Sequence, residues 1–256
     1  MPLLVTVCII AGLGAGIGTG LAGLSAAAVI SPMLITFLGM DAYQAVGIAL
    51  ASDVLASAFS AYTYYRNKNI DIRNGLLMLV STLVFTMIGS FIASLVPNST
   101  LGSFSVYMTL LLGIKFIIKP VMNTKTSNDS KTARQKAVQS LIAGCIIGFI
   151  CGFIGAGGGM MMLLILTSIL GYELKTAVGT SVFIMAFTAF TGAASHIYLD
   201  GMPGLLPFII CITATLAGAL GAARFANKAD NRVLNRITGI VLTVLGLIMV
   251  LVKYLG

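Results

Sequence analysis

A glycine-rich interruption occurs twice in this chain, each time inside an apolar segment that is too long for one membrane-spanning helix. The two segments are Leu3–Leu38 and Ala137–Leu170. At about 1.5 Å per residue, each would form roughly 50 Å of helix against a hydrocarbon core of about 30 Å. Each segment must therefore fold back or break, and the glycines within Gly16–Ser25 and Gly148–Gly159 mark where it does so.

The two interruptions belong to an internal repeat that covers most of the chain. A shift of 132 positions superimposes glycines of the first half on glycines of the second: Gly16 on Gly148, Gly20 on Gly152, Gly23 on Gly155, Gly47 on Gly179 and Gly89 on Gly221. A duplicated, interrupted hydrophobic segment is the best sequence indication of the binding site of a secondary transporter.

The composition agrees with a polytopic helical membrane protein. The chain is 58% hydrophobic and 9% charged, whereas a soluble domain carries about a quarter charged residues. Its apolar runs are continuous rather than alternating, which argues against a β-barrel. The net charge of +8 resides in short loops between apolar runs, so we expect no nucleic-acid partner. The four cysteines lie in apolar runs without metal-ligand spacing, and we expect no metal and no cofactor.

The apolar segments divide into two groups around a polar stretch. We expect repeat one at residues 1–122, a cytoplasmic linker at 123–136 and repeat two at 137–256, together forming one membrane domain. Each repeat is predicted to consist of a broken or re-entrant hairpin plus three transmembrane helices. The segments are Leu3–Leu38, Ala42–Tyr65, Gly75–Val96, Leu101–Val121, Ala137–Leu170, Thr176–Leu199, Leu205–Ala226 and Ile237–Tyr254.

The distribution of Lys and Arg favours inverted repeats. If each long segment crosses the membrane once, the repeats are parallel and the basic residues divide 10 to 5 between the two sides. If each long segment is a hairpin, the second repeat is inverted and the division becomes 14 to 1. Since cytoplasmic loops carry the excess of Lys and Arg, we expect inverted repeats in the plasma (inner) membrane, with both termini outside.

The half-helices that follow the two breaks are the candidate substrate site. A helix that begins in mid-membrane exposes unpaired N–H groups and the positive end of its dipole, which favour an anion. The candidate binding residues at these starts are Gly23, Ser25, Ala26, Gly157, Gly158 and Gly159. The alternative is that the glycines only allow close helix packing, a reading that fits Gly12, Gly16 and Gly20 well.

Asp53 is the only ionisable residue near the middle of an apolar span. A central Asp is costly in a membrane, so it should face a cavity or a partner. We expect it to accept a proton or couple an ion, or else to join two helices as a neutral, hydrogen-bonded side chain. Its equivalent in the second repeat is Met185, so the acid breaks the duplication.

Hydroxyl side chains near the breaks could donate to an oxyanion. Thr180 and Ser181 follow Gly179, and Ser31 lies in the half-helix after the first break. Alternatively, these hydroxyls bond to their own backbone, as Ser and Thr often do in membrane helices. The adjacent Ser195 and His196 point about 100° apart on a helix, which argues against a hydrolase pair, and we expect no enzymatic activity.

The chain resembles the TauE/SafE family of sulfite and organosulfur-anion permeases over nearly its full length. The resemblance lies in Gly148–Gly159, Ala177–Ser181 and His196–Gly201. In the first repeat, Ser25-Ala26-Ala27-Ala28 stands where the family usually has a glycine cluster.

The resemblance implies a secondary transporter that moves a small sulfur-containing anion, such as sulfite, sulfoacetate or thiosulfate, through the lipid bilayer without ATP. We expect alternating access, with protons coupled through Asp53 as a further expectation. A passive anion channel is the alternative reading, and an intramembrane enzyme is a third.

Overall fold

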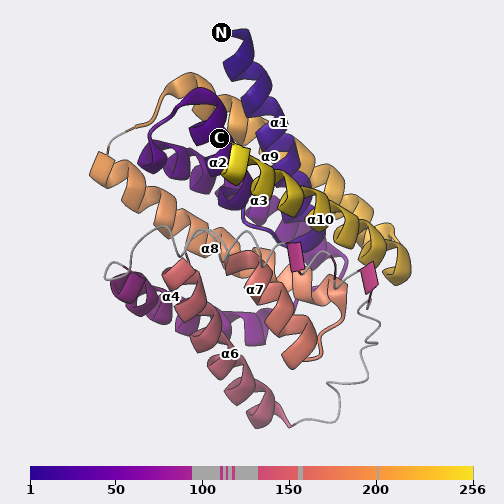
Figure 1. The fold of residues 1–256 in the computed structure, drawn as a ribbon. Coiled ribbons are helices and arrows are strands. Elements are labelled where there is room, and N and C mark those ends of the chain that lie inside the picture. The colour runs from indigo at the N-terminus through magenta and orange to yellow at the C-terminus, as the bar shows by residue number, and fades with distance from the viewer. Residues whose placement is uncertain are drawn as a thin grey trace.

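The computed structural model describes residues 1–93, 110, 111, 114, 117, 118, 132–154, 158–200 and 202–255, and the regular secondary structure of these residues is helical. Within them there are nine α-helices and one short π-helix (Figure 1). The first half contains α1 (Pro2–Ala22), α2 (Ala27–Leu38), α3 (Ala42–Arg66) and α4 (Ile72–Ala93). The second half contains α6 (Ala133–Ile154), α7 (Gly158–Leu164), the π-helix η2 (Ile165–Ile169), α8 (Leu174–Asp200), α9 (Leu205–Lys228) and α10 (Asn231–Leu255).

The predicted helical membrane protein is confirmed at this level. Four helices of the described residues are long and apolar enough to cross a membrane: α1, α3, α8 and α9. The first long apolar segment is interrupted between α1, which ends at Ala22, and α2, which begins at Ala27. In the second, the described helices are α6, up to Ile154, and α7, from Gly158, and residues 155–157 lie outside the described residues. Most of the helix predicted at Leu101–Val121 and most of the linker lie outside the described residues.

The first break has a well-defined cause at Gly23. This residue has a φ of +63°, in the left-handed region that glycine adopts without strain. Its N–H donates to the Thr19 carbonyl at 2.9 Å, and the Leu24 N–H donates to the Gly18 carbonyl at 3.2 Å. These bonds close the last turn of α1 as a left-handed cap. The chain therefore leaves the axis of α1, and α2 begins at Ala27.

Side-chain caps set the starts of α4 and α6. Asp71 accepts a hydrogen bond from the Asn74 N–H at 3.1 Å at the start of α4. Thr132 and Gln135 form a reciprocal capping box, in which the Thr132 N–H donates to Gln135 Oε1 at 3.1 Å. Because of this cap, α6 begins at Ala133, before the apolar segment that was predicted to start at Ala137.

Small residues allow α1 to pack closely along α9. A Cβ atom placed on Gly12 would lie 2.7 Å from the Cβ atom of Ala214, and one on Gly20 would lie 2.7 Å from that of Ala222. Residue numbers rise together along the contact, so the two helices are parallel, as Figure 1 shows. The packing role considered for Gly12, Gly16 and Gly20 is confirmed.

The same interaction recurs between α4 and α6. A Cβ atom on Gly144 would lie 2.6 Å from the Met78 carbonyl oxygen, and one on Gly148 would lie 2.8 Å from the Thr82 Cα atom. Gly144 and Gly148 are the repeat equivalents of Gly12 and Gly16. Each pair of parallel helices therefore joins one helix from each half of the chain, through equivalent glycines.

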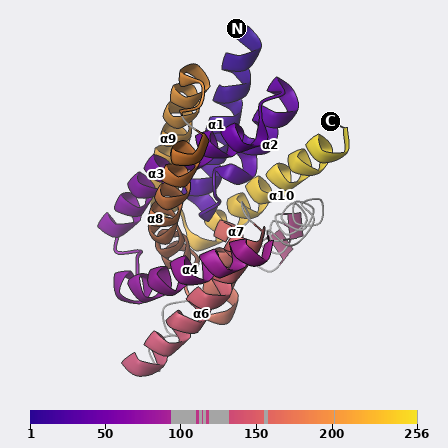
Figure 2. The same cartoon turned by 90° about the vertical axis from the view of Figure 1, so that its left-hand side faces the viewer.

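The helices α3 and α8 form an antiparallel pair between these two parallel pairs. Gly192 of α8 lies against the Leu50 side chain, whereas Gly179 lies against Tyr64 at the other end of α3. Figure 2 shows α1 and α9 above α4 and α6, with the two chain ends toward the top of the view. The buried middle of α3, which contains Asp53, is thereby brought to the first break.

Candidate functional site

The candidate site is centred on Asp53, whose side chain is 1% exposed. Ser25 Oγ donates to Asp53 Oδ2 at 2.8 Å, and Ser57 Oγ donates to Asp53 Oδ1 at 2.9 Å. A third hydrogen bond comes from the backbone of Ala26. Three of the predicted site residues, Ser25, Ala26 and Asp53, therefore lie in direct contact.

Asp53 serves as a cap for a helix to which it does not belong. The cap residue of α2, Ala26, has no side-chain hydrogen bond of its own to the exposed N–H groups. The carboxyl of Asp53, from α3, accepts from this helix start instead. A carboxylate at a helix N-terminus is favoured by the positive end of the dipole and by the unpaired N–H donors.

The second break lies against the first. A Cβ atom on Gly159 would overlap the Gly23 carbonyl oxygen and would lie 3.0 Å from the Ser25 nitrogen. Gly159 is buried, and α7 begins one residue earlier, at Gly158. Gly157, the remaining glycine of the predicted site, lies outside the described residues. The absence of a side chain at Gly159 is what allows the two half-helix starts to approach each other.

The two halves of this arrangement have different polarity. The Met185 Sδ atom lies 2.8 Å from the position of a Cβ atom on Gly159. Met185 is the repeat equivalent of Asp53, so both residues lie at the start of the half-helix in their own repeat. The start of α2 lies beside the Asp53 carboxyl and hydroxyl groups, whereas the start of α7 lies beside the Met185 thioether.

The structure separates the two predicted hydroxyl residues of α8. Ser181 lies against Gly23 at the first break, and its hydroxyl donates to the Val178 carbonyl at 2.8 Å. Thr180 points to the start of α4, where its Oγ1 atom accepts from the Asp71 N–H at 3.2 Å. Of these two residues, Ser181 is the one that the structure brings to the breaks, and its hydroxyl bonds to its own helix.

A polar face of α3, which was not recognised from the sequence, extends from Asp53 along the first break. It comprises Asp53, Ser57, Ser60 and Tyr64, and the spacing of three and four residues was the available signal. Tyr64 donates to the Gly20 carbonyl at 2.8 Å and so fixes the end of α1. The hydroxyls of Ser60 and of Ser31 in α2 are buried without a hydrogen-bond partner in the structure.

A second polar cluster joins three loops at the far end of α3. Tyr172 donates to the Asp71 carboxylate at 2.9 Å. Burial is the main factor that raises the pKa of the Tyr172 phenol, and the adjacent Asp71 carboxylate adds to it. Asn69 donates to the Asn227 side chain at 2.7 Å, and Lys175 donates to the Asn227 carbonyl at 3.3 Å. These bonds hold the α3–α4 loop, the start of α8 and the end of α9 together.

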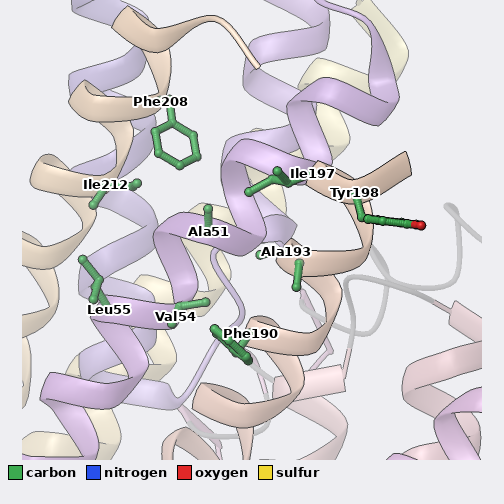
Figure 3. A pocket seen from close by; sticks show the side chains of 10 residues that line it. Ala51, Val54, Leu55, Phe190, Ala193, Ile197, Tyr198, Phe208 and Ile212 are labelled. Carbon is green, nitrogen blue, oxygen red and sulfur yellow. The ribbon is translucent and has the colours of Figure 1, made fainter. Parts of the chain in front are cut away.

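A groove between α3, α8 and α9 is apolar and does not suit an anion. It has a volume of about 700 Å³, and Leu55, Phe190 and Phe208 surround it (Figure 3). Its lining contains no charged side chain. The described residues also contain no group of His, Cys, Asp and Glu side chains that could hold a metal ion.

Comparisons with known proteins agree with this membrane architecture. The family described as "Sulfite exporter TauE/SafE" matches residues 8–249. The chain is 25% identical to the probable membrane transporter protein YunE of Bacillus subtilis (strain 168), over 94% of this chain and 95% of YunE. It is 23% identical to the probable membrane transporter protein YdhB of the same organism, over 91% of this chain and 95% of YdhB.

Proposed function

The chain belongs to the sulfite exporter TauE/SafE family, whose members are membrane transporters, and on this basis we propose that it is a secondary transporter of small sulfur-containing anions. The substrate class is that of sulfite, sulfoacetate and thiosulfate. The anion binds where the two glycine breaks meet. The observation that carries this proposal is the contact of Gly159 with Gly23 and Ser25, which brings two half-helix starts together in the interior.

The donors at this junction are suited to an oxyanion. Ser25 supplies a hydroxyl, and the backbone N–H groups come from Ala26 at the start of α2 and from Gly158 and Gly159 at the start of α7. In the proposal, Gly157 adds a further N–H group, and Ser181 and Gly23 lie beside the anion. Thr180 acts indirectly, by fixing α8 to the start of α4. The site needs no cationic side chain because helix starts bind anions through backbone donors.

Inverted repeats are part of the proposal, and the directions of the helices support them. With the 132-residue shift, α1 corresponds to α6, α3 to α8 and α4 to α9. Because α3 and α8 are equivalent helices, inverted repeats would give them opposite directions, and they do pack as an antiparallel pair. The same relation converts the parallel pair α1–α9 into the parallel pair α6–α4, because α1 corresponds to α6 and α9 corresponds to α4.

The proposed orientation places both termini outside and the linker in the cytoplasm, in the plasma membrane. It requires the α3–α4 loop and the loops around α8 and α9 to share one side, as the bonds of Asn69 and Lys175 to Asn227 indicate. That side then contains 14 of the 15 Lys and Arg residues. Alternating access arises from rocking of the helix pairs about the junction of the breaks.

Transport assays in proteoliposomes test the proposed function. Purified protein should take up radiolabelled sulfite or thiosulfate by saturable counterflow against an unlabelled pool of the same anion. Proton coupling predicts accumulation when a pH gradient is imposed. Flux that does not saturate and shows no counterflow would identify a passive channel. Transport of neither anion above the rate of empty liposomes would contradict the proposal.

A further inference from the structure

We propose that Asp53 is a built-in competitor of the transported anion: its carboxylate occupies the donors at the start of α2 and releases them when it takes up a proton. This inference rests on the proposed function and specifies how proton and anion are coupled at the same site. It differs from a simple proton-binding role, because protonation of Asp53 frees the hydrogen-bond donors that the anion then uses.

The donors at the start of α2 already hold one acidic group, the carboxyl of Asp53. The Ser25 hydroxyl and the Ala26 backbone, which a substrate oxyanion would use, both bond to the carboxyl of Asp53. A hydroxyl has one proton to donate, and an N–H group likewise has one. While ionised Asp53 accepts both, a second anion would meet occupied donors and a negative charge at hydrogen-bonding distance. The two anions therefore exclude each other.

Protonation removes both obstacles at once. A neutral carboxyl is a weaker acceptor than a carboxylate, and it carries an O–H group that can itself donate to the substrate. The Ser57 hydroxyl bonds to the other carboxyl oxygen of Asp53 at 2.9 Å. This bond holds the Asp53 side chain against its own helix while the anion replaces it at the donors. The proton remains on Asp53 while the anion occupies the donors, so one proton accompanies each anion.

The duplication explains why only one of the two half-sites can act in this way. Met185 lies beside Gly159 at the position that Asp53 has in the first repeat. A thioether carries no charge and accepts hydrogen bonds weakly, so the donors at the second break face no internal anion. The first repeat, which has Ser25 and alanines in place of the glycine cluster, holds the titrating competitor.

Asp53 has no charged partner among the described residues that would hold its charge fixed. Its described partners are the Ser25 and Ser57 hydroxyls and the Ala26 backbone. The helices packed against α3 are α1, α2, α8 and α9. Their titratable side chains are Cys8 of α1, Lys175, His196, Tyr198 and Asp200 of α8, and Cys211, Arg224 and Lys228 of α9. On α3 itself, Tyr64 bonds to the Gly20 carbonyl and not to Asp53.

Competition of this kind makes anion affinity depend on pH in a defined direction. Binding of proton and anion is mutually favourable, by the reciprocity of linked equilibria. Where Asp53 is ionised in the free protein, affinity for the anion should fall about tenfold for each unit that the pH rises. An Asp53→Asn variant lacks the titrating charge, so its affinity should be independent of pH and should match the low-pH affinity of the wild type within a few-fold.

Equilibrium binding of radiolabelled thiosulfate to the purified full-length protein tests the inference. Thiosulfate is the better probe because, unlike sulfite, it keeps its charge between about pH 5.5 and about pH 8. The expected result is a wild-type affinity that weakens across this range and an Asp53→Asn affinity that stays constant. An Asp53→Asn variant that retains the wild-type pH dependence, or that loses binding at every pH while still folded, would overturn the inference.

A Ser57→Ala variant provides an independent test if Asp53→Asn fails to fold. Removing the Ser57 donor destabilises the ionised carboxylate but leaves the Ser25 and Ala26 donors intact. The pH at which affinity falls should therefore move upward, with the low-pH affinity unchanged. No shift would contradict the competition. Failure of the wild type to bind thiosulfate or sulfite at any pH would instead contradict the proposed function itself.

Discussion

At the residue scale, the absence of a side chain decides how closely the two breaks can meet. Gly159 lies against the Gly23 carbonyl oxygen, the Ser25 nitrogen and the Met185 sulfur, so even one methyl group has no room. Gly23 supplies the left-handed turn that ends α1 and also accommodates Ser181. Two glycines with different roles therefore determine the geometry of the junction.

A Gly159→Ala substitution should separate the breaks. Its methyl group would meet backbone atoms of the first break, and overpacking of this kind costs about 1–3 kcal/mol. We expect lower thermal stability and anion transport reduced by at least about tenfold, measured by counterflow. Gly221→Ala is the matched control, because a Cβ atom there meets nothing within 4 Å. Wild-type counterflow in Gly159→Ala would contradict the proposed site.

At the element scale, the equivalent glycines of α1 and α6 produce two parallel pairs with α9 and α4. The sequence predicted the first break and the short half-helices, because hydrophobic length and glycine spacing are local properties of the chain. It offered close packing as the alternative role of Gly12, Gly16 and Gly20, but it did not predict which helices these glycines contact. It did not predict that Asp53 of α3 caps α2, since that contact joins residues 28 positions apart through the fold. It also missed the α6 start, although Thr132 and Gln135 carried a readable capping signal.

The native cysteines offer a direct check of the α1–α9 pairing. Cys8 and Cys211 are both buried, and the Cys211 thiol donates to the Cys8 carbonyl at 3.9 Å across the two helices. In a Cys145→Ala, Cys151→Ala background, a membrane-permeant oxidant should join them within the monomer. The disulfide can be detected by mass spectrometry of the peptide pair, with Cys211→Ser as the control. Cross-linking only between monomers would contradict this pairing.

At the scale of the whole molecule, the proposal is that the second repeat is inverted relative to the first. This inversion would account for the antiparallel α3 and α8, the two parallel pairs and the polar cluster that joins the loops around Asn227. The distribution of Lys and Arg in the sequence favours the same arrangement, because loop charge reports on sidedness. Sequence could not reveal which side chains line the junction, since Thr180 and Ser181 are adjacent in the chain but point to different neighbours.

Membrane sidedness separates the inverted arrangement from the parallel one. In a cysteine-free variant of the chain, single cysteines at Lys68 and Lys175 should react with an impermeant thiol reagent only from the cytoplasmic side. A cysteine at the exposed Met202, in the loop before α9, should react only from outside. Labelling of positions 68 and 175 from opposite sides would contradict inverted repeats.

The central claim is that the anion binds where the two breaks meet, and an anion located directly in the protein tests it most closely. Selenite is a heavy analogue of sulfite whose selenium scatters anomalously. Crystals of the protein grown with selenite at acidic pH should show an anomalous peak between the breaks, placed so that the selenite oxygens lie within hydrogen-bonding distance of Ser25 and Gly159. A peak confined to the apolar groove of Figure 3 or to the loop cluster around Asp71, with none between the breaks, would contradict the account.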